Sequence, residues 1–415
     1  MDHNRMNYVL IFIDPSLFTI AMTFLSINAV ITYFLSGLGA TTFEIGLANA
    51  LVSIGAVVSQ PMFVNKVLNL PYKLKAFTRL LYTQRFFLLA FIFSIPVLAK
   101  HHAHAMVDLF LVCWGVFNFF VGSYSTFYMT LFAKMISEQQ RGRLRGFSIA
   151  IGNLLALGAS YVTGLFLRKI AFPYNYTIIF AIGAVFLLLD ATAFAFMKEI
   201  PDQVSEVKLN YIQYFRRIPA ALRENAKFKQ IVLGSSFMVI SQVSLAYYAL
   251  YAIRSYHARA EDIALFTAMT GIVNIVGNIV FGLLGDRYGH SAVLILSAVF
   301  GGVAGFLVIG LHYLWVVYVA FSLTNLCLSG YSLSNGLLMI ESVPRERLPM
   351  CISINTVVTL IVSSVCTIAG SIFIEHVSFT AMFAVTGVAG GIAWVVYHRF
   401  RLVHPSSPPS ITNVQ

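Results

Sequence analysis

Three charged side chains inside long apolar stretches are the residues most able to do chemistry: Asp14, Arg85 and Asp190. An ionised group in the core of a bilayer is costly, so such a residue is a functional candidate wherever it occurs. A carboxylate there can take up and release a proton, and a guanidinium can hold that carboxylate in place. We therefore treat all three as candidate coupling residues.

The depths of Arg85 and Asp190 in their apolar stretches are similar. At 1.5 Å of helix rise per residue, both lie roughly 12 Å from the same membrane surface. We predict that they form an ion pair within the N-terminal half; a coupling role and snorkelling of Arg85 to the surface are the alternatives. Asp14 precedes Pro15 near the start of the first stretch, where we expect a hydrated carboxylate rather than a proton site.

The sequence shows no residue pattern typical of a metal site, a catalytic site or an ATP-binding loop. His101, His102 and His104 cluster between two apolar stretches without a nearby carboxylate or cysteine, so we expect surface histidines rather than a metal site. The 4 cysteines lie in apolar runs without metal-ligand spacing. No glycine loop followed by Lys and Ser or Thr is present to hold ATP phosphates. We predict no catalytic residue, no metal and no cofactor.

Composition indicates a membrane protein. The chain has 415 residues, of which 59% are hydrophobic and 10% charged, and its mean hydropathy is +0.82. A soluble domain has about 25% charged residues. A chain with so little charge cannot bury all of its apolar side chains in a water-soluble fold, so lipid must cover the remainder.

The apolar stretches predict an all-α membrane protein with twelve transmembrane helices in two six-helix bundles. A helix needs about 20 apolar residues to cross the bilayer core. The predicted spans are 8–36, 43–64, 76–99, 106–133, 146–167, 174–197, 229–253, 262–284, 291–311, 314–339, 350–373 and 378–398. We expect an N-terminal bundle at 1–198, a cytoplasmic loop at 199–228, a C-terminal bundle at 229–403 and a disordered cytoplasmic tail at 404–415.

The distribution of basic residues predicts that both termini are cytoplasmic. With this orientation, most of the 27 lysines and arginines lie in cytoplasmic segments, as the positive-inside rule requires. The outer segments hold only Lys100, Arg168, Lys169, Arg254 and Arg259. The formal net charge of +11 therefore reflects membrane topology, and we predict no nucleic-acid partner.

The two halves of the sequence resemble each other. Arg141-Gly142-Arg143-Leu144 opens the fifth span and Arg345-Glu346-Arg347-Leu348 opens the eleventh. Glu44-Ile45-Gly46-Leu47 and Asp262-Ile263-Ala264-Leu265 begin the second and eighth spans in the same way. The matching order indicates a duplicated six-helix unit, which is typical of one class of transporters.

A glycine-rich loop between the eighth and ninth spans is the most distinctive motif. It consists of Gly282, Gly285, Asp286, Arg287 and Gly289. The glycines allow a tight turn, and Asp286 could dock at the N-terminus of the fifth span, where partial positive charge and free N–H groups favour a carboxylate. Arg143 and Arg145 belong to that same end. The alternative is a solvated turn whose charges only fix the helix ends.

This loop resembles the conserved loop motif of the major facilitator superfamily. The stretch 38–47, leading to Gln60-Pro61, resembles the link between the first two helices of that superfamily. The resemblance implies two six-helix bundles and a central cavity lined mainly by helices 1, 4, 7 and 10. It further implies rocker-switch alternating access, with Asp286 helping to hold the cytoplasmic gate shut.

Some features depart from the pattern of the superfamily. The loop after the second span lacks glycines and has Asn65 about where an acid is expected, so we predict a one-sided gate made by Asp286. The fourth span lacks the arginine of many proton-driven drug exporters, and the fifth lacks the glycine-proline signature of antiporters. Both absences weaken the hypothesis of drug efflux by proton antiport without excluding it.

Neutral polar and aromatic residues of helices 1, 4, 7 and 10 are the candidates for the substrate cavity. They are Asn28, Asn118, Tyr124, Gln242, Tyr247, Tyr251, Asn325, Tyr331 and Asn335. Hydrogen-bonding groups mixed with aromatic faces suit a neutral or amphipathic molecule better than a multiply charged one. The alternative for each residue is a hydrogen bond that joins neighbouring helices.

The sequence thus favours a monomeric secondary active transporter, not an enzyme, in the cytoplasmic membrane. Its partners would be a small organic substrate, the lipid bilayer and, with proton coupling, protons. Proton-coupled export of a neutral or amphipathic solute is the leading hypothesis. Uptake of a sugar or another nutrient, and transport of a lysolipid, are the alternatives.

Overall fold

The computed structural model is entirely helical in the part of the chain that it describes. It describes residues 3–68, 70–136, 138–199, 201, 222–223, 225–343 and 347–403. Twelve helical segments in these ranges are long and apolar enough to cross a membrane, which confirms the predicted number of spans. The predicted tail at 404–415 and most of the predicted central loop lie outside the described residues.

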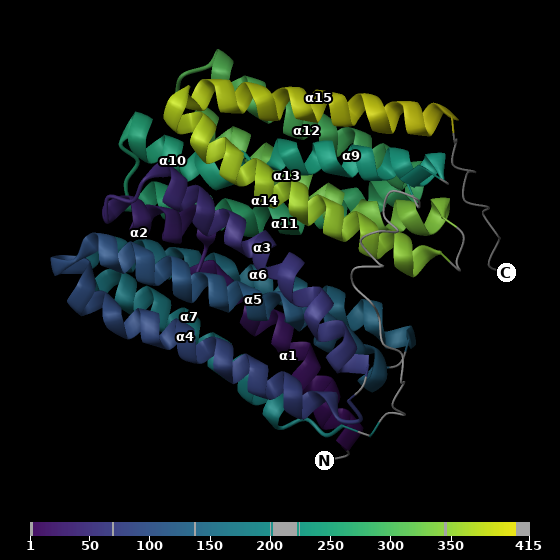
Figure 1. The fold of residues 1–415 in the computed structure, drawn as a ribbon, viewed down its shortest axis with the longest axis horizontal. Helices are drawn as coiled ribbons and strands as arrows, with labels where there is room; N and C mark the ends of the chain where they lie inside the picture. Colours follow the sequence, from purple (N-terminus) through teal and green to yellow (C-terminus); the bar gives the residue numbers. More distant parts are fainter. Residues whose placement is uncertain are drawn as a thin grey trace. The chain divides into compact units, whose positions relative to one another are not determined.

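The helices group into two compact units (Figure 1). The first comprises Met1–Asn210 and His257–Ile272, and the second comprises Tyr211–Tyr256 and Val273–Gln415. The first six spans are α1 (His3–Phe24) with η1 (Ile27–Ile31) and α2 (Thr32–Gly37), then α3 (Thr42–Leu68), α4 (Lys73–His101), α5 (Ala103–Met135), α6 (Glu138–Lys169) and α7 (Tyr174–Ala195).

The other six spans follow the same plan. They are α9 (Ala226–Gln242) with α10 (Leu245–Tyr256), then α11 (Ala260–Tyr288), α12 (His290–Gly310), α13 (Leu314–Ser342), α14 (Leu348–His376) and α15 (Phe379–Val403). The beginning of α11 belongs to the first unit and the remainder of that helix to the second.

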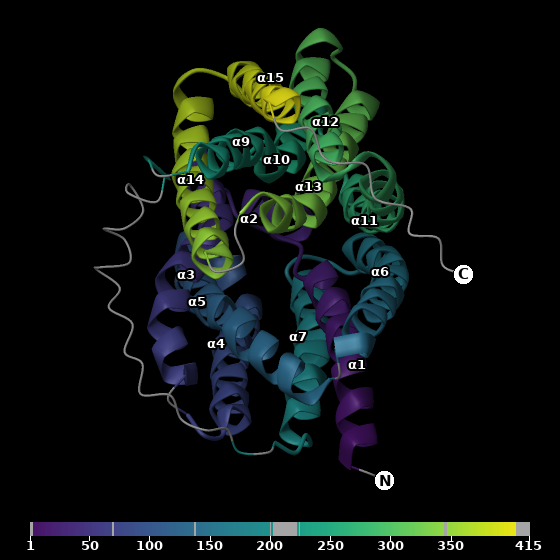
Figure 2. The same ribbon diagram turned by 90° about the vertical axis from the view of Figure 1, so that its right-hand side faces the viewer.

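Both units have the same order of helix neighbours. In the first unit α6 packs on α1, α1 on α7, α7 on α4, α4 on α5, and α5 on α3 (Figure 2). In the second unit α14 packs on α9, α9 on α15, α15 on α12, and α12 on α13. The fifth, first, sixth, third and fourth helices of each half are thus neighbours in that order, as a duplicated six-helix unit requires.

The sequence similarity between the second and eighth spans corresponds to a shared helix cap. The Glu44 carboxylate accepts a hydrogen bond from the backbone N–H of Thr41 at 2.7 Å. The Asp262 carboxylate accepts one from the N–H of Arg259 at 2.6 Å. In both cases the acid satisfies a donor three residues earlier that the helix leaves free, so the duplicated acids begin α3 and α11 in the same way.

The first and seventh spans are both interrupted, which the sequence did not predict. In the first span α1 ends at Phe24, Ser26 is extended, and the π-helix η1 follows. In the seventh span two turn residues, Val243 and Ser244, separate α9 from α10. An interrupted helix leaves backbone groups without their usual partners, and transporters use such groups to bind solutes.

Glycines bring the backbones of α12 and α15 into contact in the second unit. A Cβ added to Gly305 would lie 2.6 Å from the backbone nitrogen of Gly387, and one added to Gly390 would clash with the backbone of Gly302. Small residues allow this approach, which replaces side-chain packing by backbone van der Waals contact. Gly391, the next residue, has no atom within 4 Å of an added Cβ.

We expect Gly390→Ala to destabilise the protein and Gly391→Ala not to. The new methyl group at 390 must push α12 and α15 apart, at a cost of about 1–3 kcal/mol. The melting temperature of the purified protein should fall for Gly390→Ala and should be unchanged or raised for Gly391→Ala. Equal effects of the two neighbouring substitutions would show that α12 and α15 do not pack through Gly390.

Candidate functional site

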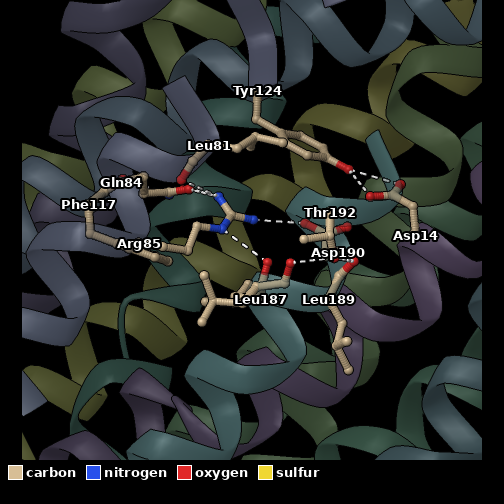
Figure 3. A network of polar contacts seen from close by, with 11 residues as sticks. Asp14, Leu81, Gln84, Arg85, Phe117, Tyr124, Leu187, Leu189, Asp190 and Thr192 are labelled. Carbon is tan, nitrogen blue, oxygen red and sulfur yellow. Dashed lines mark hydrogen bonds and ion pairs between the residues drawn. The ribbon is translucent and has the colours of Figure 1, made fainter. Parts of the chain in front are cut away.

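A buried ion pair joins α4 and α7 in the first unit. The Nη2 atom of Arg85 lies 2.7 Å from Oδ2 of Asp190, and both side chains are almost completely buried. The predicted pairing of these two residues is confirmed (Figure 3). Because a buried charge without a partner is strongly unfavourable, each group depends on the other to remain in the core.

The guanidinium of Arg85 is held from several sides. Its Nε donates to the carbonyl of Leu187 at 3.2 Å, and Nη1 donates to the carbonyl of Leu81 at 3.4 Å and to Oε1 of Gln84. Gln84 in turn donates from Nε2 to the carbonyl of Phe117 at 3.0 Å. The site therefore includes Gln84, which sequence analysis missed although it directly precedes Arg85 in the same apolar stretch.

Asp14 belongs to this cluster, which corrects the prediction of a hydrated carboxylate. Its side chain is fully buried, and the hydroxyl of Tyr124 donates to both carboxylate oxygens at 2.8 and 2.9 Å. α1 turns Asp14 towards α5 in the interior of the unit, and the position of a residue along a span does not reveal this direction. Tyr124 is fixed by stacking on Phe18 and Tyr128, with ring centroids 5.7 and 5.2 Å away.

Two buried carboxyl groups and one guanidinium make up the charges of this cluster, and Asp190 is the acid that contacts Arg85. Asp14 and Asp190 lie close enough to interact with each other, and Arg85 is the cation beside them (Figure 3). Among the described residues, Oδ1 of Asp190 has no hydrogen-bond partner. With both acids ionised, these three side chains carry one uncompensated negative charge. One added proton makes the cluster neutral and supplies a hydrogen-bond donor for an unpaired carboxylate oxygen such as Oδ1 of Asp190.

The corresponding helices of the second unit meet through neutral side chains. Ser235 of α9 donates to Oδ1 of Asn335 in α13 at 2.9 Å and lies 3.3 Å from the hydroxyl of Tyr397 in α15. Nδ2 of Asn335 is 3.4 Å from the hydroxyl of Tyr331. These uncharged groups join the first, fourth and sixth helices of the second unit. In the first unit Asp14, Tyr124 and Asp190 lie on the same three helices, and the third helix adds Arg85. Because uncharged groups can join these helices, the charges of the first unit call for a functional explanation.

The structure places the predicted cavity residues in different environments. Asn118 and Asn325 are buried and donate to carbonyls of their own helices, those of Trp114 and Phe321. Tyr247 is buried and donates to the carbonyl of Thr367. The Tyr247 bond joins α10 to α14, which is the alternative that the sequence left open, whereas the two asparagine bonds stay within one helix.

Tyr124, Tyr331 and Asn335 belong to the two polar clusters described above. The remaining predicted cavity residues are Asn28, Gln242 and Tyr251. Asn28 is half-buried in η1, directly at the interruption of the first span. Gln242 is half-buried at the end of α9, at the interruption of the seventh span, with Nε2 3.7 Å from Sγ of Cys327. The hydroxyl of Tyr251 is 3.5 Å from that of Tyr256. Two predicted residues therefore lie at helix interruptions.

The glycine-rich motif forms a one-residue link between α11 and α12. Gly289 has a φ of 83°, a conformation that L side chains disfavour, and α12 starts at the next residue. Gly282, Gly285, Asp286 and Arg287 form the last turns of α11, with Asp286 exposed. The side chains of Arg143 and Arg145 lie outside the described residues, so the gate contact of Asp286 stays a prediction.

Comparisons with known proteins agree with this architecture. The family model described as Major Facilitator Superfamily matches residues 231–414. A variant of the nucleoside transporter NupG superposes with a TM-score of 0.72 at 13% identity, covering 97% of this chain and 100% of that one. Residues 231–414 thus belong to the Major Facilitator Superfamily, and the chain as a whole has the fold of this transporter. None of the curated proteins compared with it matches in sequence.

Two further solved structures have the same fold. A bacterial homologue of the iron transporter ferroportin, in an inward-facing state, has a TM-score of 0.72 at 14% identity over 95% of this chain and 98% of that one. The D-xylose-proton symporter has a TM-score of 0.67 at 17% identity over 96% of both chains. The family match and the shared fold agree with the prediction of a multi-pass membrane transporter rather than an enzyme.

We expect removal of Arg85 alone to be more harmful than removal of Arg85 together with Asp190. Arg85→Leu leaves two buried carboxyl groups without a cation, at a cost of about 3–5 kcal/mol. Adding Asp190→Leu removes one of those groups and should restore part of the lost melting temperature. Asp108→Leu, which removes an exposed acid of α5, is the control. Added to Arg85→Leu, it should not raise the melting temperature.

Proposed function

We propose that this transporter couples movement of a small neutral or amphipathic organic solute to a proton carried by the cluster of Asp14, Asp190 and Arg85. The observation that carries the proposal is that two fully buried carboxyl groups, one paired with Arg85 and the other held by the hydroxyl of Tyr124, lie in a cluster with a single guanidinium. A proton bound here neutralises the cluster, and release of that proton recreates a buried charge. Such a group favours different conformations in its two states, which is what coupling requires.

The helix interruptions support a solute that forms hydrogen bonds. Asn28 lies in η1 and Gln242 at the end of α9, and both are half-buried. An amide side chain can donate and accept, and the interruptions leave backbone groups beside it. Because both side chains are uncharged, we propose a neutral or amphipathic solute rather than an ion. Among the described residues, no group of three His, Cys, Asp or Glu side chains could hold a metal ion.

Export and uptake make different use of the same cluster. In export, proton entry would drive the solute out; in uptake, proton and solute would move in the same direction. Resemblance to the superfamily, rather than any residue, favours export as the leading direction. Nutrient uptake is the second candidate, because the structural neighbours include a nucleoside transporter and a D-xylose-proton symporter. Location in the cytoplasmic membrane is part of either proposal.

Alternating access by a rocker switch is the proposed mechanism, with Asp286 as one side of the cytoplasmic gate. Asp286 is exposed in the last turn of α11, and the one-residue link through Gly289 fixes the start of α12 beside it. An exposed carboxylate at a helix end can dock at a positively polarised helix N-terminus in one state and be hydrated in the other. Opening and closing of the gate would therefore need no large conformational change within α11 itself.

Solute binding should depend on pH, and this dependence should require the buried acids. We would screen sugars, nucleosides, amino acids, lysolipids and cationic dyes by thermal shift of the purified protein at two pH values. A ligand present at 100 times its dissociation constant stabilises the folded state by about 2.7 kcal/mol. Asp14→Asn and Asp190→Asn, which keep the volume but cannot ionise, should each abolish the pH dependence of the ligand-induced shift.

Asp108→Asn is the matched control, because Asp108 is an exposed acid of α5 outside the cluster. It should leave both the shift and its pH dependence intact. A ligand whose shift is equal at both pH values in the unmodified protein would contradict proton coupling. A polar nutrient as ligand would favour uptake, whereas a lipophilic ligand would favour export or lysolipid transport.

We expect Asp286→Asn to increase the population of the cytoplasm-open state. The substitution removes the charge that would dock at the start of α6, and interactions of this kind contribute about 0.3–1 kcal/mol, up to about 2 in partly buried sites. Distances between spin labels on the cytoplasmic ends of the two units should lengthen in a larger fraction of molecules. Unchanged distance distributions, with Asp108→Asn as reference, would remove Asp286 from the gate.

A further inference from the structure

An apolar groove runs between α12 and α15 in the second unit. Its volume is about 520 Å³, within the range of about 300–1,000 Å³ that is usual for small-molecule sites. Val303, Phe306 and Trp394 contribute to its walls, and they are 47%, 50% and 40% exposed in the whole chain. The groove therefore opens outwards on two membrane-spanning helices, where hydrocarbon rather than water is the solvent.

The glycines of both helices create this hollow. Gly302 and Gly387 line the groove at the place where the two backbones touch, and Gly391 borders it without any atom within 4 Å of an added Cβ. Because glycine has no side chain, glycines on the facing sides of two adjacent helices leave a channel along the line where the helices touch. Because the lining is apolar apart from the indole N–H of Trp394, an alkyl chain fits it better than a polar molecule.

One stripe of α15 connects the groove to a cationic helix end. Gly387, Gly391, Trp394, His398 and Arg401 follow one another at intervals of three or four residues, which places them on one face of the helix. The ring of His398 stacks on that of Trp394, with centroids 5.4 Å apart. The stripe thus changes from glycine through aromatic to basic residues towards the end of α15.

The basic end is formed by two helices. Nη2 of Arg401 lies 3.5 Å from the carbonyl oxygen of Tyr288 at the end of α11, and the guanidinium of Arg287 lies 5.3 Å from the centroid of the Tyr288 ring. Arg399 is exposed on the same turn of α15 as Arg401. Asp286 and Glu341, whose Oε1 lies 3.8 Å from Nε2 of His290 at the start of α12, are the acids at this end, and three arginines outweigh them. The basic-residue distribution predicts that this end is cytoplasmic.

We propose that the groove and the basic end together bind one anionic phospholipid. Its head group lies at Arg401 and Arg287, and one acyl chain passes over Trp394 into the groove. Trp394, at the near end of the groove, lies seven residues before Arg401 along α15, about 10 Å at 1.5 Å per residue, and one leaflet of the hydrocarbon core is about 15 Å thick. A chain anchored at Arg401 therefore reaches the groove. Basic groups near the cytoplasmic leaflet attract anionic lipids.

The test uses quenching of Trp394 fluorescence by lipids with brominated acyl chains. The chain has 3 tryptophans, of which Trp114 is buried and Trp315 is exposed to the surroundings. The full-length Trp315→Phe protein would be reconstituted with brominated phosphatidylglycerol or with brominated phosphatidylcholine of the same chains. We expect half-maximal quenching of Trp394 at a lower mole fraction of phosphatidylglycerol, by about fivefold for each arginine that contacts the head group.

Two variants separate the contributions of chain and head group. Gly391→Leu fills the groove without meeting the helix contact and should weaken quenching by both lipids about tenfold, which is about 1.4 kcal/mol. Arg401→Gln should remove most of the preference for phosphatidylglycerol and leave the groove open. Gly158→Leu, at an exposed glycine of α6 that also has open space around it, is the control and should change neither quantity.

Several results would overturn the proposal. Equal quenching by the two lipids in the unmodified groove would exclude an anionic head-group site. The same preference at Trp315, measured in a Trp394→Phe protein, would show general enrichment of the lipid around the chain instead of a site. A dimer that dissociates on Gly391→Leu, seen by light scattering, would assign the groove to a second copy of the chain.

Discussion

The hydrocarbon core of a bilayer offers no hydrogen-bond partner to a polar group, and this constraint governs the structure. Every backbone N–H and C=O in that layer must be satisfied by the protein, so the spans are helices. The same constraint applies to side chains. Arg85 remains in the core because Asp190, Gln84 and two backbone carbonyls accept its N–H groups. Asp14 remains there because the hydroxyl of Tyr124 faces both of its oxygens.

Some of the places where the constraint is relaxed coincide with the proposed functional sites. The interruptions after Phe24 and after Gln242 release backbone groups from helical bonding in the first and seventh spans. Within the described part of the chain, Oδ1 of Asp190 is a buried acceptor without a donor. A solute and a proton are the two species that a transporter can use to satisfy such groups, and both can leave again because they bind reversibly.

Duplication provides an internal comparison for these features. Both units have the same neighbour order, and acids at equivalent positions cap α3 and α11. Shared features of this kind belong to the fold. The polar clusters of the two units differ. The first unit has Asp14, Arg85 and Asp190 on its first, third and sixth helices, and the second has Ser235, Asn335 and Tyr397 on its first, fourth and sixth. The glycine contact of α12 with α15 and the groove beside it are likewise features of the second unit.

The sequence by itself determined the number of spans, the duplicated plan and the pairing of Arg85 with Asp190. These follow from apolar length, from repeated motifs and from depth in the membrane, which are properties of position along the chain. Only the tertiary structure decided that Asp14 is buried against Tyr124, that Gln84 holds Arg85, and that Asn118 and Asn325 bond to their own helices. Those outcomes depend on which way a side chain faces and on what a neighbouring helix presents there, and a one-dimensional pattern contains neither. The interruptions of the first and seventh spans also escaped prediction, because no proline or glycine marks them and the apolar pattern continues through both.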